Sequence, residues 1–460
     1  MTINWGHCSF RFPLRAKRVL RRATHVGYPR PLRWELIWSF DEVPFNSHQL
    51  SIQHWQYIGR RRATSPTMPF PNPETAMAAN LTHFSLQVGD DVLADLKNRL
   101  AHVRWPDEVP DNRWKYGTDL PYLKSLVGYW REGYDWRKHE AKLNGFKQYK
   151  VKLAGIDVHF IREEGKGPKP LPLLISHGWP GSVHEFHKII PMLTDPERFG
   201  GDPADAFTVI APSLPGYAFS FTPNQQRFSV EQIADVFAEL MTGVLGYKRF
   251  AAQGGDWGGF VTSRLGYAYP ERLAGIHINL LSLRRDTAPP ENPTAEEKRY
   301  FEERAHWMKE EVGYTWIQGT KPQTLAYALT DSPVGLAAWI VEKFHTWSDH
   351  GGDLDAYLGK DEILTNIMLY WVTGAIGSSF WPYYARMHGP WPIPDGARIG
   401  VPMGYAEFPR EILRPPRSLA EKMYSDIRRW SKMPKGGHFA ALEQPKLLAQ
   451  EIREFFRPLR

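Results

Sequence analysis

The chain of 460 residues contains one cysteine, Cys8, which excludes a framework of intramolecular disulfides and any metal site built from cysteines. It has no uninterrupted apolar run of about 18 residues, so the sequence predicts no membrane-spanning helix. We find no His, Asp and Glu residues at metal-ligand spacing, and no glycine-rich loop followed by the Lys-Ser/Thr pair that binds phosphates. We therefore expect neither a metal nor a cofactor.

The formal net charge of +7 comes entirely from residues 1–76, which hold eleven Lys and Arg against four Asp and Glu. The rest of the chain is neutral, so the charge does not predict a nucleic-acid partner. Residues 1–76 also lack helical or strand periodicity, and they resemble neither a secretory signal nor a membrane anchor. We expect a disordered extension or, preferably, a stretch upstream of the true start at Met68 or Met77; a transit peptide is the alternative. The protein is expected to be cytoplasmic.

The segment Gln253-Gly254-Gly255-Asp256-Trp257-Gly258 stands between a strand-like run at 247–252 and a segment with helical periodicity. A strand, a tight glycine-rich turn and a helix form the nucleophile elbow of α/β-hydrolases, whose pattern is Gly-x-Ser-x-Gly. Here Asp256 occupies the serine position. A carboxylate attacks an sp³ carbon and leaves an alkyl ester, whereas a serine attacks an acyl carbon. The alternative is an ordinary glycine-rich turn with a capping aspartate.

A histidine follows near the C-terminus, in Lys435-Gly436-Gly437-His438-Phe439. The paired glycines predict a loop and the apolar residues after Pro445 have helical spacing, so we expect His438 on a strand-to-helix connection at the same sheet edge as Asp256. Elbow enzymes place the nucleophile, the acid and the histidine in this order along the chain. Either Glu407 or Glu411, after a strand expected at 399–404, could orient the imidazole.

A third element is the strand expected at 171–176, followed by His177-Gly178-Trp179-Pro180. A turn after this strand can aim the N–H of Trp179 at the nucleophile, and the N–H of Trp257 would be the second donor of an oxyanion hole. Trp179-Pro180 is a candidate cis bond. His177 is expected to brace the loop, and a catalytic base is the alternative interpretation.

These motifs, with Phe408-Pro409-Arg410-Glu411, resemble those of the microsomal-type epoxide hydrolases, in order and at the family's spacing from about Phe84 to the C-terminus. The resemblance implies an α/β fold: an α/β-hydrolase core with a mostly parallel sheet, an N-terminal meander and a helical lid. It also implies that Asp256 is the nucleophile, His438 the general base and Glu411 its orienting acid, because in this family the acid follows Phe-Pro-x.

The same resemblance implies two lid tyrosines that hold the epoxide oxygen. Tyrosine suits this task because it is a neutral donor at pH 7, with a pKa of about 10. The first follows a glycine in a segment ending Thr-Lys-Pro, which selects Tyr314. The second lies four residues after a Ser-Ser pair, which selects Tyr383, although the run after the serines departs from the family's charged pattern and Tyr384 is the alternative. Tyr314, Tyr383 and Trp179 would contact the substrate.

The expected organisation is an extension at 1–76, an N-terminal segment at 77–165, two halves of the core at 166–283 and 396–460, and the lid at 284–395. Asp90 or Asp91 is expected to cap the first helix, and a hairpin is expected across 149–160. Core strands are expected at 171–176, 207–211, 249–253, 273–279, 399–404 and near 427–433.

The sequence therefore predicts an enzyme that converts an apolar epoxide and water to a vicinal diol through an ester on Asp256. The sequence leaves open whether the protein forms a homodimer. One rival is a haloalkane dehalogenase, which would use the same Asp, His and acid but would not need two lid tyrosines. The other rival is a non-catalytic ligand-binding protein on this fold, which we would expect to have lost at least one of the three residues.

Overall fold

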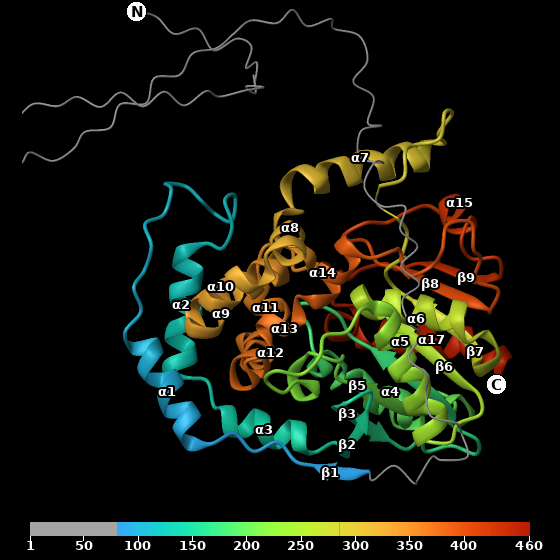
Figure 1. The fold of residues 1–460 in the computed structure, drawn as a ribbon, viewed down its shortest axis with the longest axis horizontal. Coiled ribbons are helices and arrows are strands. Elements are labelled where there is room, and N and C mark those ends of the chain that lie inside the picture. The colour runs from blue at the N-terminus through green and yellow to red at the C-terminus, as the bar shows by residue number, and fades with distance from the viewer. Residues whose placement is uncertain (1–80, 285) are drawn as a thin grey trace, which may run out of the picture. The chain divides into compact units, whose positions relative to one another are not determined.

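The computed structural model describes residues 81–284 and 286–460, which belong to one compact unit. The expectations for residues 1–76, Cys8 among them, lie outside the described residues. Within the described part, the strands form a single sheet in the order β1-β2-β3-β5-β4-β6-β7-β8-β9 (Figure 1). The strands are β1 (Thr82–Phe84), β2 (Gln148–Leu153), β3 (Ile156–Glu163), β4 (Leu171–Ser176), β5 (Phe207–Pro212), β6 (Phe250–Gly254), β7 (Leu273–Ile278), β8 (Met403–Glu407) and β9 (Ile427–Lys432).

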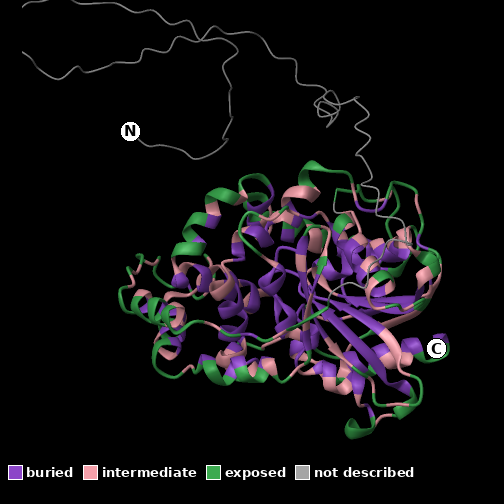
Figure 2. Ribbon diagram, turned by 60° about the horizontal axis from the view of Figure 1, so that its bottom comes forward, coloured by how far each residue is buried: buried purple, intermediate pink, exposed green. Residues whose placement is uncertain are grey.

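The sheet is parallel from β5 to β9 and antiparallel from β1 to β3, and β3 joins β5 in antiparallel register. Every residue of β5 and β7 is buried, as expected for parallel strands covered on both faces. Buried residues are accordingly concentrated along the sheet and exposed residues along the outer helices (Figure 2). The expected mostly parallel α/β sheet is confirmed.

Helices cover both faces of the parallel strands. α17 (Pro445–Phe456) packs against α4 (Ile189–Thr194), whereas α5 (Val230–Glu239) packs against α6 (Asp256–Ala268). Neighbouring residues of β7 show that the two pairs lie on opposite faces, because Gly275 faces Phe455 of α17 while Ile276 faces Gly266 of α6. The short α15 (Arg417–Ala420) and α16 (Ala440–Glu443) complete the core helices.

The eighth strand lies further along the chain than the sequence suggested. β8 begins at Met403, whereas a strand was expected at 399–404. Ile399 makes only an isolated bridge to Tyr424, and Pro402 has no N–H to donate to a ladder. The proline therefore delays the strand until the residue after it.

The N-terminal segment contains α1 (Asp90–Ala101), α2 (Leu120–Glu132), α3 (Trp136–Asn144) and the β2–β3 hairpin. Ala154 and Gly155 at the hairpin turn both have positive φ, as a two-residue type I′ turn requires. The cap of α1 was wrongly predicted, since Gly89 is the N-cap and Asp90 and Asp91 lie in the first turn. There their charges still favour the helix, because its N-terminus carries partial positive charge.

A helical insertion lies between β7 and β8, in the segment expected to be the lid, and it is called the lid from here on. Its helices are α7 (Ala295–Glu310), α8 (Gly313–Thr320), α9 (Pro322–Asp331), α10 (Pro333–Trp347), α11 (Leu354–Tyr357), α12 (Lys360–Thr373), α13 (Ile376–Ser379) and α14 (Trp381–His388). α1 and α2 pack against α10, and α2 also packs against α12, so lid helices lie between these two N-terminal helices and the sheet (Figure 1). Hydroxyls of Tyr122 and Tyr129 on α2 donate to Asp355 and Asp361 of the lid at 2.7 and 2.8 Å.

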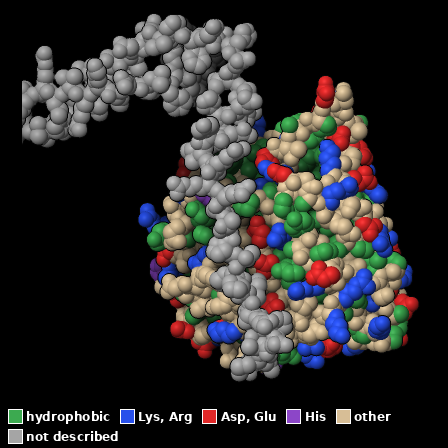
Figure 3. Space-filling view, turned by 45° about the vertical axis from the view of Figure 1, so that its right-hand side comes forward, with side chains coloured by type: hydrophobic (Ala, Val, Ile, Leu, Met, Phe, Trp, Pro, Cys, Tyr) green, Lys and Arg blue, Asp and Glu red, His purple; other side chains and the backbone are tan. Residues whose placement is uncertain are grey.

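No single helix among the described residues is long and apolar enough to cross a membrane. On the face seen in Figure 3, Lys and Arg side chains are interspersed with Asp and Glu side chains, and no large area has one sign of charge.

Candidate active site

The turn between β6 and α6 presents Asp256 at the carboxyl end of the parallel strands. β6 ends at Gly254, α6 begins at Asp256, and the φ of Asp256 is 48°, in the left-handed region. A non-glycine residue is strained there, and such strain occurs where one side chain must be held in place. The glycine at 258 lets the turn approach β4, because a Cβ on Gly258 would lie 1.9 Å from the backbone oxygen of Ser176. The structure thus has the expected elbow, with Asp256 at its apex.

The loop after β4 holds one oxygen of the Asp256 carboxylate. The backbone N–H of Trp179 donates to Oδ1 across 2.8 Å, and the Trp179–Pro180 peptide bond is cis. Trp257 is the second residue of α6, so its N–H is among those left without an intrahelical partner in the first helical turn. The loop therefore places the Trp179 N–H on the carboxylate, and the helix start leaves the Trp257 N–H, on the next residue after Asp256, without a helical partner.

His177 braces this loop. Its Nδ1 donates to the Gly178 carbonyl across 3.0 Å, and its Nε2 accepts from the N–H of Leu214 across 3.1 Å. These backbone partners fix one neutral tautomer, and burial lowers the pKa of His177 to about 4. Both ring nitrogens are occupied by backbone groups, so the geometry favours the bracing role over that of a base.

His438 connects Asp256 to an acid. Its Nδ1 lies 2.6 Å from Oε1 of Glu411, and its Nε2 lies 3.5 Å from Oδ2 of Asp256. His438 and Glu411 are each 5% exposed. Burial opposes a charge on the imidazole, but the carboxylates of Glu411 and Asp256 outweigh it and raise the pKa of His438 well above its ordinary value. Of the two acids left open by the residues alone, the structure brings Glu411, and not Glu407, to the imidazole.

The two expected tyrosines lie over the loop that holds Asp256. The Tyr314 ring on α8 stacks on the Trp179 ring at 5.3 Å, and the Tyr383 ring on α14 meets it edge-on at 5.8 Å. The two tyrosine rings are 5.7 Å apart. Burial, followed by the nearby Tyr314 and Asp256, raises the pKa of Tyr383 well above its ordinary value.

Tyr384 lies elsewhere. Its ring stacks on His388 at 4.0 Å and on Trp381 at 4.7 Å, within its own helix. The structure therefore brings Tyr383 to the site and leaves Tyr384 on the outer side of α14.

Comparison with known proteins points to one family. Residues 81–186 match the family described as epoxide hydrolase N terminus, and residues 172–313 match the alpha/beta hydrolase fold. A putative epoxide hydrolase of Stigmatella aurantiaca is 45% identical over 83% of this chain and 86% of its own length. Epoxide hydrolase 1 of Sus scrofa is 37% identical over 84% of this chain and 91% of its own length.

The chain belongs to the epoxide hydrolase family. Among solved structures, the juvenile hormone epoxide hydrolase of Bombyx mori has a TM-score of 0.73 at 30% identity, covering 83% of this chain and 95% of the other. The epoxide hydrolase of Aspergillus niger has a TM-score of 0.73 at 29% identity, covering 84% of this chain and 98% of the other.

In this epoxide hydrolase, a narrow cavity of about 20 Å³ lies beside the elbow, lined among others by Asp256, His438, Trp179 and Glu185. A polar space of this size is enough for one water molecule. Burial raises the pKa of Glu185 to about 8, although the neighbouring His438 lowers it. Sequence reasoning missed Glu185, whose signal was a carboxyl between His184 and Phe186, shortly after the Trp179 loop.

Glu443 is a second residue that sequence reasoning missed. Its carboxylate accepts hydrogen bonds from the backbone N–H groups of Gly437, Phe439 and Asp349, each at 2.9 Å. Gly437 and Phe439 flank His438, so Glu443 fixes the loop that carries the imidazole. The signal was its position five residues after the histidine, at the end of a short helix.

Away from the Asp256 site, one cluster among the described residues has a geometry that could bind a metal ion. His184, His187 and Glu362 place one possible ligand atom each within 4.8 Å of one another. None of these three side chains lines the cavity at Asp256. The sequence search for metal-ligand spacing did not reveal this cluster, because the carboxylate comes from α12, far along the chain from the two histidines.

Proposed function

We propose that this protein hydrolyses apolar epoxides to vicinal diols through an ester on Asp256. The observation that carries the proposal is the position of Tyr314 and Tyr383, whose rings lie against the Trp179 ring while the N–H of Trp179 holds the carboxylate. Attack on an epoxide needs a nucleophile on one side and a proton donor for the ring oxygen on the other. A dehalogenase would need no such pair of hydroxyls.

In the first step, Oδ2 of Asp256 forms a bond to an epoxide carbon and the carbon–oxygen bond of the ring breaks. The leaving oxygen takes a proton from a tyrosine hydroxyl. The raised pKa keeps Tyr383 protonated and able to donate until the oxygen develops charge. Because the ester is neutral, the pKa of His438 falls once Asp256 is alkylated. The proton that His438 then releases restores the tyrosine.

In the second step, neutral His438 takes a proton from water and the hydroxide attacks the Cγ atom of the ester. The backbone N–H groups of Trp179 and Trp257 would stabilise the oxyanion that forms. Collapse of the intermediate breaks the ester bond, and the diol leaves with the proton of the new carboxyl group. The carboxylate of Asp256 is then again beside a protonated imidazole, and atoms and charges balance.

The walls of the site favour an apolar substrate. The rings of Trp179, Trp257, Tyr314, Tyr383 and Trp347 form a continuous set of contacts around the elbow. Aromatic surface of this kind binds hydrocarbon groups, and its polar atoms are the tyrosine hydroxyls and the indole N–H groups. Detoxification of epoxides, or the breakdown of aromatic hydrocarbons, is the role that such a site would serve.

A single turnover in water enriched in ¹⁸O tests the mechanism. With enzyme in excess over styrene oxide, the first diol should contain unlabelled oxygen and the peptide that carries Asp256 should gain the label. Label in the diol on the first turnover would mean that water attacks the epoxide directly. Release of chloride from a chloroalkane, without diol from styrene oxide, would support the dehalogenase interpretation.

A further inference from the structure

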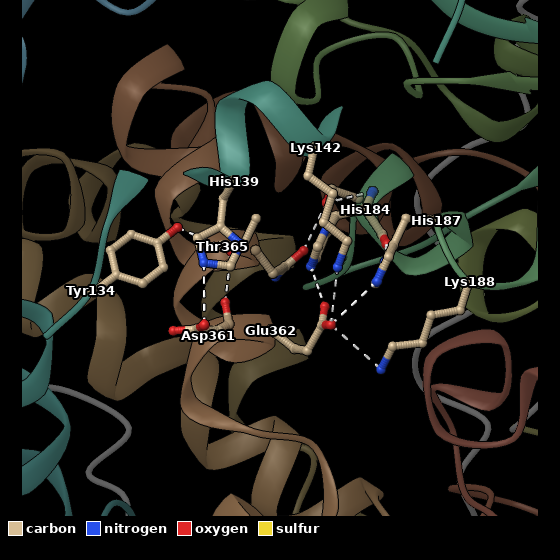
Figure 4. A network of polar contacts seen from close by, with 11 residues as sticks. Tyr134, His139, Lys142, His184, His187, Lys188, Asp361, Glu362 and Thr365 are labelled. Carbon is tan, nitrogen blue, oxygen red and sulfur yellow. Dashed lines mark hydrogen bonds and ion pairs between the residues drawn. The ribbon is translucent and has the colours of Figure 1, made fainter. Parts of the chain in front are cut away.

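A second polar centre lies where the lid, the core and the N-terminal segment meet (Figure 4). Glu362 of α12 points between two histidines of the core, with Nε2 of His184 2.8 Å from its Oε2 and Nε2 of His187 3.2 Å from its Oε1. The ammonium groups of Lys142 on α3 and Lys188 lie 3.5 and 3.6 Å from Oε1. The histidine side chains are 2% and 4% exposed, and that of Glu362 is 15% exposed.

The local helix type brings the two histidines together. His184 lies in a 3₁₀ helix at Val183–Phe186 and His187 directly follows it. Residues three apart eclipse one another in a 3₁₀ helix, whereas in an α-helix they are offset. The two imidazole rings accordingly stack 4.5 Å apart, with 6° between their planes. Both Nε2 atoms are therefore presented to the same carboxylate.

The hydrogen bond of His187 to the backbone determines which of its ring nitrogens carries a proton, and so which atom faces Glu362. Its Nδ1 is 2.7 Å from the backbone oxygen of His184, which can only accept, so Nδ1 carries a proton. If the ring is neutral, the lone pair of Nε2 faces a carboxylate oxygen at 3.2 Å, and the two repel. The contact therefore requires a cation between them, either a second proton or a metal ion.

Other atoms of the cluster also lack partners. Neither ring nitrogen of His184 makes a hydrogen bond of good geometry, nor does Oε2 of Glu362. A neutral imidazole is the form that binds metals, and both rings present Nε2 to the same carboxylate, at 2.8 and 3.2 Å. A backbone carbonyl on the far nitrogen, as His187 has, is the usual way of orienting a histidine ligand.

We propose that His184, His187 and Glu362 bind a divalent transition metal ion, with solvent completing the coordination. Two imidazoles and one carboxylate suit zinc and its neighbours in the first transition row, and exclude calcium and magnesium, which take oxygen ligands. The ammonium groups of Lys142 and Lys188 would repel a metal cation at this position. Their side chains are 47% and 33% exposed, so they move into solvent when the metal replaces them as partners of Glu362.

Such an ion would join the loop of Trp179 to the lid. The 3₁₀ helix follows that loop, and α12 already binds it, because Asn366 donates to the Pro180 carbonyl at 2.7 Å and Tyr370 to the Gly181 carbonyl at 2.7 Å. Ser182 at the start of the 3₁₀ helix also donates to Oδ1 of Asn366 at 2.8 Å, and the metal would add a further link between the same two elements. Its role is therefore structural, and it lies apart from the residues that surround the reacting atoms.

Titration with Co²⁺ and Zn²⁺ tests the site. Tag-free enzyme, treated with a chelator and dialysed at pH 7.5, should bind one equivalent of Co²⁺ with a visible d–d absorption, and one equivalent of Zn²⁺ by calorimetry. Zinc should raise the melting temperature by a few degrees, because it binds the folded state. His187→Gln and Glu362→Gln should each weaken binding at least tenfold, and Lys188→Met should tighten it.

His139→Gln is the matched control, since His139 lies in the same network at Asp361 but offers no ligand to the cluster, and it should bind Co²⁺ as the unmodified enzyme does. X-ray absorption of the zinc-loaded unmodified enzyme should show two imidazole ligands, which keeps the test valid if a variant fails to fold. Absence of binding would overturn the proposal. Binding that survives both ligand changes, or a spectrum with fewer than two imidazoles, would overturn it equally.

Discussion

The carboxylate of Glu443 accepts hydrogen bonds from the backbone on both sides of His438. Oε2 binds the N–H of Gly437 and Oε1 binds the N–H of Phe439, each at 2.9 Å. The hydroxyl of Tyr357 donates to Oε2 as well, at 3.2 Å. A single half-buried acid therefore determines where the loop holds the imidazole, while Glu411 determines how the ring is turned.

Glu443→Gln should slow hydrolysis of the ester about tenfold and leave its formation little changed. One amide NH₂ would replace an acceptor, so at least one backbone N–H would face a donor, at a cost of about 1–3 kcal/mol. Rapid-quench measurement of the two steps separates them. Glu407→Gln is the control, because Glu407 does not bond to the imidazole. Equal slowing of both steps would show that Glu443 acts on the whole site rather than on the loop of His438.

His438→Gln should spare the first step and block the second. The carboxylate of Asp256 needs no base to attack, but the ester needs a water from which a proton is removed. Intact-protein mass spectrometry should show enzyme heavier by one substrate. Asp256→Ala should show neither adduct nor turnover. The mechanism fails if His438→Gln turns over normally and accumulates no adduct.

Tyr314→Phe and Tyr383→Phe should each slow ester formation by about 10²- to 10⁴-fold, the usual contribution of a positioned proton donor. Hydrolysis of an ester already formed should change little. Tyr384→Phe is the matched control, because its ring lies one residue along the same helix and stacks on His388 instead. Loss of activity in Tyr384→Phe, with Tyr383→Phe silent, would contradict the geometry of α14.

Local sequence chemistry predicted much of the fold and the site. β4 begins and ends where its apolar run does, and the Gly-rich elbow, the Gly-Gly loop of His438 and the hairpin at Ala154 and Gly155 each depend on neighbouring residues. The lid tyrosines followed from the resemblance instead, since ring contacts between α8, α14 and the Trp179 loop leave no local pattern.

Long-range relationships account for what the sequence did not predict. Glu362 meets His184 and His187 only after α12 packs on the core, so no spacing reveals the cluster. Glu185 and Glu443 are ordinary carboxyls in sequence, and they gain their roles through burial beside His438. β8 begins later than predicted because Pro402 lies within an otherwise strand-like run.

Glu185→Gln should make the protein more stable than the unmodified enzyme at alkaline pH. The folded-state pKa of Glu185, about 8, lies above its ordinary value. Between these values the folded state holds a proton that the unfolded state has lost, so this carboxyl makes stability fall as the pH rises toward 8. Glutamine resembles the protonated carboxyl and does not ionise.

Melting temperatures of the two proteins from pH 5 to pH 9 check this prediction. The variant should match the unmodified enzyme near pH 5 and melt at a higher temperature at pH 9. Parallel curves over the whole range would show that Glu185 keeps an ordinary pKa in the folded protein.

Gly178→Ala should abolish most ester formation without unfolding the protein. A Cβ at this position would lie 2.2 Å from Oδ1 of Asp256 and 2.3 Å from its Cβ, so the carboxylate must move. Displacement of a reacting group by about 1 Å costs about 10²-fold in rate.

Gly128→Ala is the matched control: a Cβ there meets nothing within 4 Å, and the residue lies inside α2. Removing a glycine from a helix interior should raise the free energy of unfolding by about 0.5–1 kcal/mol and leave turnover unchanged. Single-turnover rates and denaturant unfolding of both variants measure the two effects separately. Normal ester formation in Gly178→Ala would show that the carboxylate is free to leave the N–H of Trp179 without loss of function.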